Sequence, residues 1–170
     1  RWLHDEVQVS GELPLIEAHY VQFGVNGLYV CGSTGEGVLL SLAERKQIAK
    51  IVVREARHRI PIIIHVGAVS TQDATELAAD AEKVGADAIA SVPPLFFPCS
   101  IQAIFQHYST IAGQCGLPLI LYNIPALTGV TVTAPMMSRF MGYNPVEGII
   151  LQTLFVEVNY QTISIECCCC

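Results

Sequence analysis

Short apolar runs alternate with longer amphipathic segments along this chain, and this alternation constrains the fold more than any other feature. The clearest run is Ile62-Ile63-Ile64-His65-Val66, which opens after Pro61. Continuous runs of β-branched residues are typical of strands that are buried on both faces of a parallel sheet. We therefore expect a sheet that other elements cover on both sides.

The other strands and the helices follow from the same pattern. Further strands are expected at residues 27–31, 87–92, 117–122 and 146–150. Helices are expected at residues 12–23, 41–58, 70–84, 100–113 and 133–141. Ser41 and Glu44 have the spacing of a capping box, which predicts where one helix begins. Ser70 and Gly85 predict the start and the end of the next helix.

Strands that alternate with helices of this length imply right-handed βαβ units and a parallel sheet. A doubly wound sheet and a (β/α)8 barrel both satisfy this pattern. Two observations favour the barrel. Polar, glycine-rich and aromatic residues follow strand after strand, where barrel enzymes place their active sites, and no Gly-x-Gly-x-x-Gly fingerprint follows the first strand. About five to six βα units are present, so the expected fold is a partial (β/α)8 TIM barrel.

Composition excludes several classes of protein. Hydrophobic residues make up 52% of the 170 and charged residues 14%, which is too apolar for a disordered chain. A formal net charge of −6 argues against nucleic acid or an anionic membrane as a partner. The N-terminus lacks the layout of a signal peptide, and we expect a cytoplasmic protein. The chain begins with Arg1 rather than Met, which predicts processing or a fragment.

The seven cysteines do not predict a metal site. Cys31, Cys99 and Cys115 are scattered in apolar settings and are expected to be buried, reduced thiols. The other four are the consecutive residues 167–170, whereas tetrahedral zinc sites separate their cysteine pairs by two to four residues. We expect no metal and interpret these four residues as a non-native tail.

Two segments at strand ends carry the candidate chemistry. In residues 31–37, glycines bracket Ser33 and Thr34, so a tight turn can present two hydroxyls and backbone N–H groups. This arrangement suits a small anion such as a carboxylate. The alternative is an ordinary turn between a strand and a helix. A second segment, residues 121–130 with Tyr122, follows a later strand in the same way and favours a site.

Five segments in order carry a resemblance to a known family. They are residues 32–36, 41–45, 65–67, 94–98 and 122–130. Together they resemble the N-acetylneuraminate lyase and dihydrodipicolinate synthase family of class I aldolases, over about residues 5–150. The motif Asn-Ile-Pro-Ala-Leu-Thr-Gly at residues 123–129 is more similar to the neuraminate lyase branch than to the synthase branch.

The resemblance implies a (β/α)8 barrel that binds pyruvate, or another 2-oxo acid, as a Schiff base on a lysine. It implies no metal or organic cofactor, a homotetramer, and cleavage of the sugar acid N-acetylneuraminate into N-acetylmannosamine and pyruvate. By the same resemblance, Ser33 and Thr34 would hold the pyruvate carboxylate. Tyr122 would transfer protons at the reacting centre, and Thr153 would contact the substrate in one of two alignments.

The chain departs from the family at the lysine, which the family carries at the end of the sixth strand. Counting from Tyr122 places this position at Ile150, whereas alignment on Gln152-Thr153 places it at Leu151. Neither side chain can form an imine. The chain's only lysines are Lys46, Lys50 and Lys83, all on expected helices. We therefore expect the chain as written to be inactive.

Residues 151–170 match nothing expected of the family, so we divide the chain into a partial barrel at 1–150 and a divergent tail at 151–170. A shifted reading frame, alternative splicing or a truncated gene would explain the change. Two alternatives stay open beside the lyase. One is dihydrodipicolinate synthase or another pyruvate-dependent aldolase of the family. The other is a non-catalytic truncated product that associates with family subunits.

Three further residues carry smaller expectations. His65 ends a buried strand and is expected to be a core histidine whose hydrogen bonds are satisfied. Glu36 is expected to cap its loop through backbone N–H groups. Phe96, with Phe97, stands where family members often carry a tyrosine that assists proton transfer.

Overall fold

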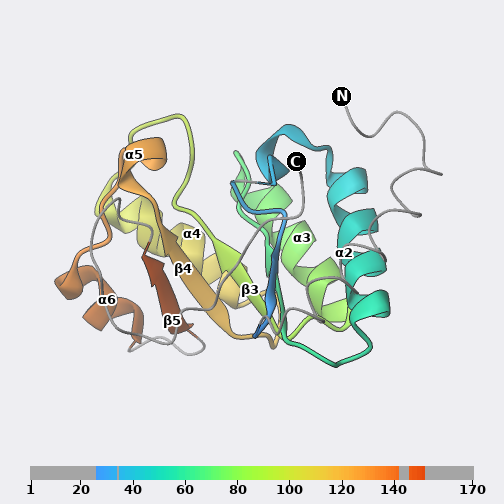
Figure 1. Cartoon of the computed structure of the whole chain (residues 1–170). Coiled ribbons are helices and arrows are strands. Elements are labelled where there is room, and N and C mark those ends of the chain that lie inside the picture. The colour runs from blue at the N-terminus through green and yellow to red at the C-terminus, as the bar shows by residue number, and fades with distance from the viewer. Residues whose placement is uncertain (1–25, 34, 142–145, 152–170) are drawn as a thin grey trace.

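Five parallel strands form the centre of the computed structural model, which describes residues 26–33, 35–141 and 146–151 (Figure 1). The strands are β1 (Leu28–Val30), β2 (Ile62–His65), β3 (Ala88–Ser91), β4 (Leu119–Asn123) and β5 (Val146–Leu151). They lie in the sheet in chain order, and every neighbouring pair is parallel. This order is that of a (β/α) barrel, because the strand order of a doubly wound sheet reverses at its switch point.

Helices connect successive strands. They are α2 (Leu42–Ala56), α3 (Thr71–Val84), α4 (Ile101–Ala112), α5 (Pro125–Thr128) and α6 (Ala134–Met141), with a 3-10 turn η1 (Gly37–Leu39) before α2. Helix α2 packs against α3, and α3 packs against α4, so these three form a layer along one face of the sheet (Figure 1). No helix in the described part of the chain is long and apolar enough to cross a membrane.

Successive strand residues point to opposite faces of the sheet and build two separate clusters. The larger cluster lies between sheet and helices and includes Ile62, Ile64, Ile89, Leu119 and Leu121. The smaller cluster covers the inner face of the curved sheet. Its buried members are Tyr29, Ile63, Ala88, Ala90, Val92, Tyr122 and Ile124. Both faces of the sheet are therefore buried, as the continuous apolar runs predict.

The helix ends confirm the caps read from the sequence. The Ser41 hydroxyl accepts a hydrogen bond from the Glu44 N–H, and the Ser41 N–H donates to the Glu44 carboxylate at 2.8 Å, which completes the capping box. Ser70 caps α3, and Gly85 ends it with a positive φ of 90°. These two caps fix where the chain leaves the loops that follow β1 and β2.

Some expectations differ from the structure or fall outside it. Residues 12–23 and 152–170 lie outside the described residues. Elements η1 and α5 are absent from the sequence prediction, because a single turn leaves no measurable periodicity. Cys31 is buried as expected, but the expectation of burial is wrong for Cys99 and Cys115, which lie just before and just after α4 and are partly exposed.

Candidate active site at the carboxyl ends of the strands

Ser33 and Tyr122 meet at the carboxyl ends of β1 and β4. The Ser33 Oγ and the Tyr122 hydroxyl oxygen are 2.7 Å apart, across 89 residues of sequence. Either hydroxyl can donate this bond, so the pair can hold a proton in two arrangements. The structure thus brings together two of the four residues that the sequence predicts for the site. The other two, Thr34 and Thr153, lie outside the described residues.

Glycines give the Ser33 loop its shape. The Gly37 N–H donates to the Gly32 carbonyl at 3.1 Å and closes the loop behind Ser33. A Cβ on Gly37 would lie 2.0 Å from the Cys31 carbonyl oxygen, and a Cβ on Gly32 would lie 2.5 Å from the Tyr29 ring. Neither position therefore accepts a side chain unless the backbone or the ring moves.

Glu36 does not have the role expected from the sequence. Its side chain is exposed and makes no capping hydrogen bond to η1. Its backbone contributes instead: the N–H donates to the Ser33 carbonyl at 3.1 Å, and φ is 51°, in the left-handed region. The expectation fails because that backbone conformation already closes the turn without the carboxylate.

Three aromatic rings surround the end of β4 on the inner face. The ring centroids of Tyr29, His65 and Tyr122 lie 5.7 to 5.9 Å apart in each pair. The Tyr29 hydroxyl is buried and has no hydrogen-bond partner among the described residues. Burial, followed by the neighbouring Tyr122, raises the pKa of Tyr29 well above its ordinary value, so it stays protonated. The inner face beside Tyr122 is thus aromatic and neutral.

His65 is only half satisfied, contrary to the sequence expectation. Its Nδ1 lies 3.0 Å from the Cys31 carbonyl oxygen, and because a carbonyl only accepts, Nδ1 must donate. Nε2 is buried without a partner in the described part of the chain. A Cβ on Gly67 would lie 2.7 Å from Nε2 and 2.8 Å from Val92 Cγ2, so the imidazole edge packs closely against Gly67. Burial, and then the charge of Arg45, lower the pKa of His65 to about 3.

Arg45 is a feature of the site that sequence reasoning missed. It lies in the first turn of α2 and is 3% exposed. One terminal nitrogen donates to the Gly67 carbonyl at 2.9 Å and the other to the His65 carbonyl at 2.6 Å. A signal was present: Arg45 lies in the family-like segment 41–45 and at helical spacing from Leu42 and Ala49 on the apolar face of α2, but its two carbonyl partners lie at and just after the end of β2.

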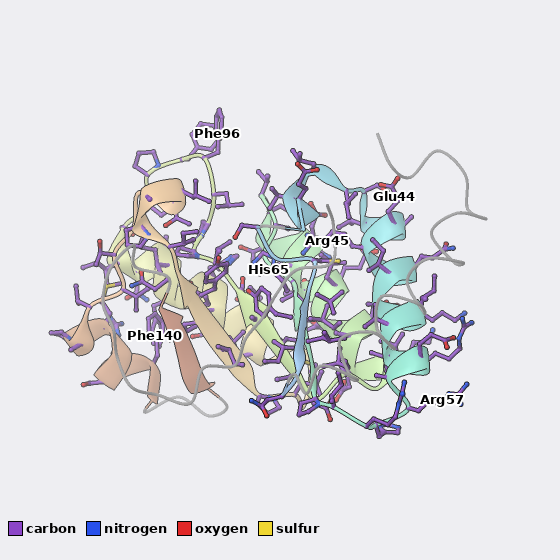
Figure 2. The ribbon with its side chains drawn as sticks, viewed as in Figure 1. Glu44, Arg45, Arg57, His65, Phe96 and Phe140 are labelled. Carbon is purple, nitrogen blue, oxygen red and sulfur yellow. The ribbon has the colours of Figure 1, made fainter. Side chains whose placement is uncertain are left out.

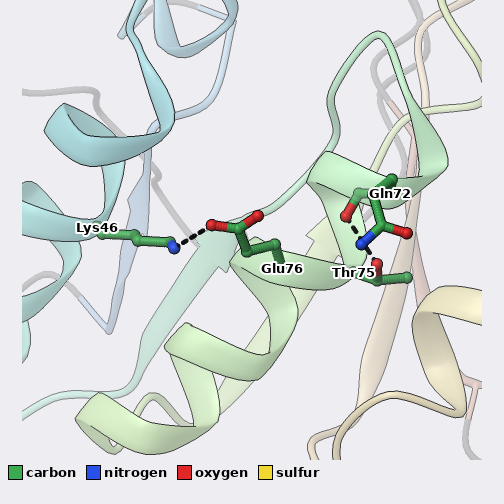
Figure 3. A network of polar contacts seen from close by, with 4 residues as sticks. All are labelled: Lys46, Gln72, Thr75 and Glu76. Carbon is green, nitrogen blue, oxygen red and sulfur yellow. Dashed lines mark hydrogen bonds and ion pairs between the residues drawn. The ribbon is translucent and has the colours of Figure 1, made fainter.

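None of the lysines reaches the strand ends. Lys46 and Lys50 lie on α2 and Lys83 on α3, as the sequence predicts. Lys46 pairs with Glu76 of α3 at 2.5 Å on the outer layer of helices, where Thr75 also donates to the Gln72 carbonyl (Figure 3). Lys50 and Lys83 are exposed. The described residues also contain no group of three or more His, Cys, Asp or Glu side chains that could hold a metal ion.

The sheet register separates the two positions considered for the family's lysine. Ile150 pairs with Tyr122 across β4 and β5, whereas Leu151 pairs with Asn123. Tyr122 belongs to the inner cluster, but the Asn123 side chain accepts a hydrogen bond from the Val132 N–H, outside that cluster. The backbone of Ile150 is thus level with the residue that carries the site's phenol.

Parallel strands in chain order, with a serine loop and a tyrosine at their carboxyl ends, define a protein of the (β/α) barrel class. The model of the dihydrodipicolinate synthetase family matches residues 7–162. The chain therefore belongs to this family, as its motifs predict. N-acetylneuraminate lyase of Escherichia coli K12 is 44% identical over 122 residues, which are 71% of this chain and 41% of that protein.

Solved structures give the same result for the fold. A catalytic-lysine mutant of Ruminococcus gnavus sialic acid aldolase has a TM-score of 0.83 at 32% identity, over 85% of this chain and 48% of that one. Acinetobacter baumannii dihydrodipicolinate synthase, complexed with pyruvate, has a TM-score of 0.79 at 37% identity, over 82% and 48%. The chain spans less than half the length of these relatives, and its fold is confirmed as a partial (β/α)8 barrel.

Replacing Gly37 tests the shape of the loop. Because a Cβ there would overlap the Cys31 carbonyl, we expect Gly37→Ala to lower the free energy of unfolding by about 2 kcal/mol or more. Urea denaturation measures this change. The matched control is Gly116→Ala, whose Cβ would meet only an oxygen of the exposed Glu82 side chain, at 3.1 Å, and should change stability by less than about 0.5 kcal/mol. Equal effects of the two substitutions would contradict this account of the loop.

Stability should fall as the pH is lowered from 7 to 5. The pKa of His65 is about 3 in the folded chain and 6.5 in the unfolded one, so the unfolded chain binds the extra proton between these values. We expect His65 to contribute a slope of about 1 kcal/mol per pH unit, with stability highest above pH 6.5. Urea denaturation at several pH values should show a shallower slope for His65→Asn. His58→Asn, at an exposed position, should keep the slope of the original chain.

Proposed function

We propose that the protein containing this sequence is a pyruvate-dependent aldolase that reversibly cleaves N-acetylneuraminate into N-acetylmannosamine and pyruvate. The observation that carries the proposal is the 2.7 Å contact between Ser33 and Tyr122 at the carboxyl ends of two strands. The 44% identity to an N-acetylneuraminate lyase supports the choice of substrate. In this proposal the protein is cytoplasmic and forms a homo-oligomer.

The residue roles follow from what the reaction requires. A 2-oxo acid needs an anion site for its carboxylate, and Ser33 and Thr34 supply hydroxyl and backbone N–H donors there. Cleavage of the carbon–carbon bond also needs a group that takes up and returns a proton near the substrate oxygens. Tyr122 fills this role, because its hydroxyl exchanges a hydrogen bond with Ser33 beside the same site. Thr153 would contact the substrate.

The amine is the missing component in this chain. Schiff-base formation joins a primary amine to the substrate carbonyl and releases water, which requires a lysine at the site. Ile150 occupies the position in register with Tyr122. We propose that the chain as written binds the 2-oxo acid without a covalent bond and does not cleave substrate. The same observation favours a second candidate function, a non-catalytic chain that associates with complete subunits, with residues 151–170 as a divergent tail.

A lysine at position 150 tests the proposal directly. We expect the original chain to give no adduct when it is incubated with pyruvate and reduced with borohydride. Ile150→Lys should gain the mass of one reduced pyruvate, because its position is in register with Tyr122. Leu151→Lys carries the same added charge one residue away, in register with Asn123, and should gain none. Intact-protein mass spectrometry measures all three, with circular dichroism to confirm folding.

Each other outcome has a definite meaning. An adduct in the original chain would show that one of Lys46, Lys50 or Lys83 reacts, against the proposal. Folded Ile150→Lys without an adduct would contradict a 2-oxo acid site beside β5. The products that Ile150→Lys forms also distinguish N-acetylneuraminate lyase from dihydrodipicolinate synthase activity. Product from N-acetylmannosamine and pyruvate supports the lyase, whereas product from aspartate semialdehyde favours dihydrodipicolinate synthase.

A further inference from the structure

Arg45 is a buried cation that forms no ion pair among the described residues. Among the described residues, the ion pairs join Lys46 to Glu76 and Arg54 to Glu55, and neither involves Arg45. Its terminal nitrogens bond two backbone carbonyls, and its Nε is buried without a partner. Figure 2 labels Arg45 near the start of α2 and His65 at the end of β2, and the contact between them runs from the Arg45 guanidinium to the His65 carbonyl. No carboxylate among the described residues forms an ion pair with Arg45, although the neighbouring Cys31 and, more weakly, Asp73 favour its charge.

Such a charge is unfavourable for folding alone. A buried cation loses solvation worth several kcal/mol, which only a partner charge and good hydrogen bonds offset. The first turn of a helix also carries a partial positive charge that repels a cation. Burial accordingly lowers the pKa of Arg45, an effect that the neighbouring Cys31 opposes. An apolar side chain would pack α2 against the sheet without this desolvation penalty. Stability alone therefore does not explain an arginine at this position.

A path of hydrogen bonds leads from Arg45 to the candidate site. The guanidinium donates to the His65 carbonyl at 2.6 Å, and His65 Nδ1 donates to the Cys31 carbonyl at 3.0 Å. Cys31 stands two residues before Ser33, whose Oγ is 2.7 Å from the Tyr122 hydroxyl oxygen. The path joins the ends of β1, β2 and β4.

The Cys31 carbonyl links this path of hydrogen bonds to the backbone of the Ser33 loop. Cys31 has φ 59°, a left-handed conformation that is uncommon and strained for a residue other than glycine. Such a conformation persists only where its surroundings hold it. The bond from His65 fixes the carbonyl, and the absence of a side chain at Gly37 lets the carbonyl take this position.

We propose that Arg45 and His65 are positioning residues of the 2-oxo acid site. Arg45 holds the end of β2 by two carbonyls, and His65 holds the Cys31 carbonyl, so that Ser33 meets Tyr122. The charge of Arg45, which no ion pair among the described residues neutralises, also favours the ligand's carboxylate from behind the loop, without touching it. This part of the inference rests on the proposed function, whereas the positioning of the loop does not.

The residue types suit these tasks. A guanidinium offers a fixed fork of N–H donors, whereas a lysine is a single point charge that cannot copy both contacts. A histidine whose pKa is about 3 stays neutral near pH 7 and keeps its proton on Nδ1. A charged imidazole beside Arg45 would instead place a second buried cation next to the first.

Nuclear magnetic resonance of the full chain, labelled with 15N-histidine, tests the positioning. In the original chain the His65 nitrogens should report a proton on Nδ1 only. Arg45→Met should mix the two tautomers, because the carbonyls of His65 and Gly67 lose their donors. Arg45→Lys should restore the signals only in part. Arg54→Met, on the exposed side of the same helix, is the matched control and should leave them unchanged.

Pyruvate titration of the same variants tests the effect on the ligand. Arg45→Met should weaken binding about tenfold or more, equivalent to about 1.4 kcal/mol. His65→Asn can place an amide N–H at the Nδ1 position and should bind within a few-fold of the original chain, whereas His65→Leu should lose binding as Arg45→Met does. A structural role alone would not produce this rescue by asparagine.

The outcomes separate the two proposals. If the original chain fails to bind pyruvate, the proposed function fails, but the tautomer signals still decide the positioning role. If Arg45→Met folds with unchanged His65 signals and unchanged affinity, the inference is overturned. Should Arg45→Met not fold, Arg45→Lys decides instead, because full recovery of both readouts would overturn the two-carbonyl contact.

Discussion

In a parallel sheet whose strands follow chain order, every strand delivers its carboxyl end to the same edge, and the rest of this structure depends on that constraint. It carries Ser33 and Tyr122, 89 residues apart, to within 2.7 Å of each other. The same register sets Ile150 level with Tyr122. The helices stabilise the arrangement by covering the outer face with apolar side chains, and the polar contact of Ser33 with Tyr122 lies at the carboxyl ends of the strands.

Buried polar atoms without hydrogen-bond partners lower the stability of this arrangement. Tyr29, His65 and Arg45 each carry a buried polar atom without a partner among the described residues. Orphaned atoms of this kind oppose folding by about 1–3 kcal/mol each. Two more such atoms, His107 Nε2 and Ser109 Oγ, lie on α4, but the first three lie around one strained loop, as is typical of sites where function competes with stability. The large outer cluster offsets these penalties.

Local signals in the sequence predict most of the fold. The capping box of Ser41 and Glu44, the stop at Gly85 and the apolar strands all depend on near neighbours, and the structure confirms them. The proximity of Ser33 and Tyr122 can also be predicted from the sequence, because the carboxyl ends of all strands in a barrel lie at one edge.

The environment of individual side chains could not be predicted in the same way. The sequence places Arg45 on the apolar face of its helix and makes His65 an ordinary core residue, but it names no partner for either. Their true partners are backbone carbonyls of other segments: those of Gly67 and His65 for Arg45, and that of Cys31 for His65. The positions of these carbonyls depend on loop conformation, which the residue types do not determine. The single-turn elements η1 and α5 were missed for a similar reason.

Pyruvate binding by a double-mutant cycle tests the central claim, that Ser33 and Tyr122 act together in one 2-oxo acid site. The affinity would be measured calorimetrically for the original chain, Ser33→Ala, Tyr122→Phe and the double variant. The account predicts that the original chain binds and that the double variant loses less affinity than the sum of the single losses, with coupling of about 0.5 kcal/mol or more. Additive losses, or no binding by the original chain, would contradict it.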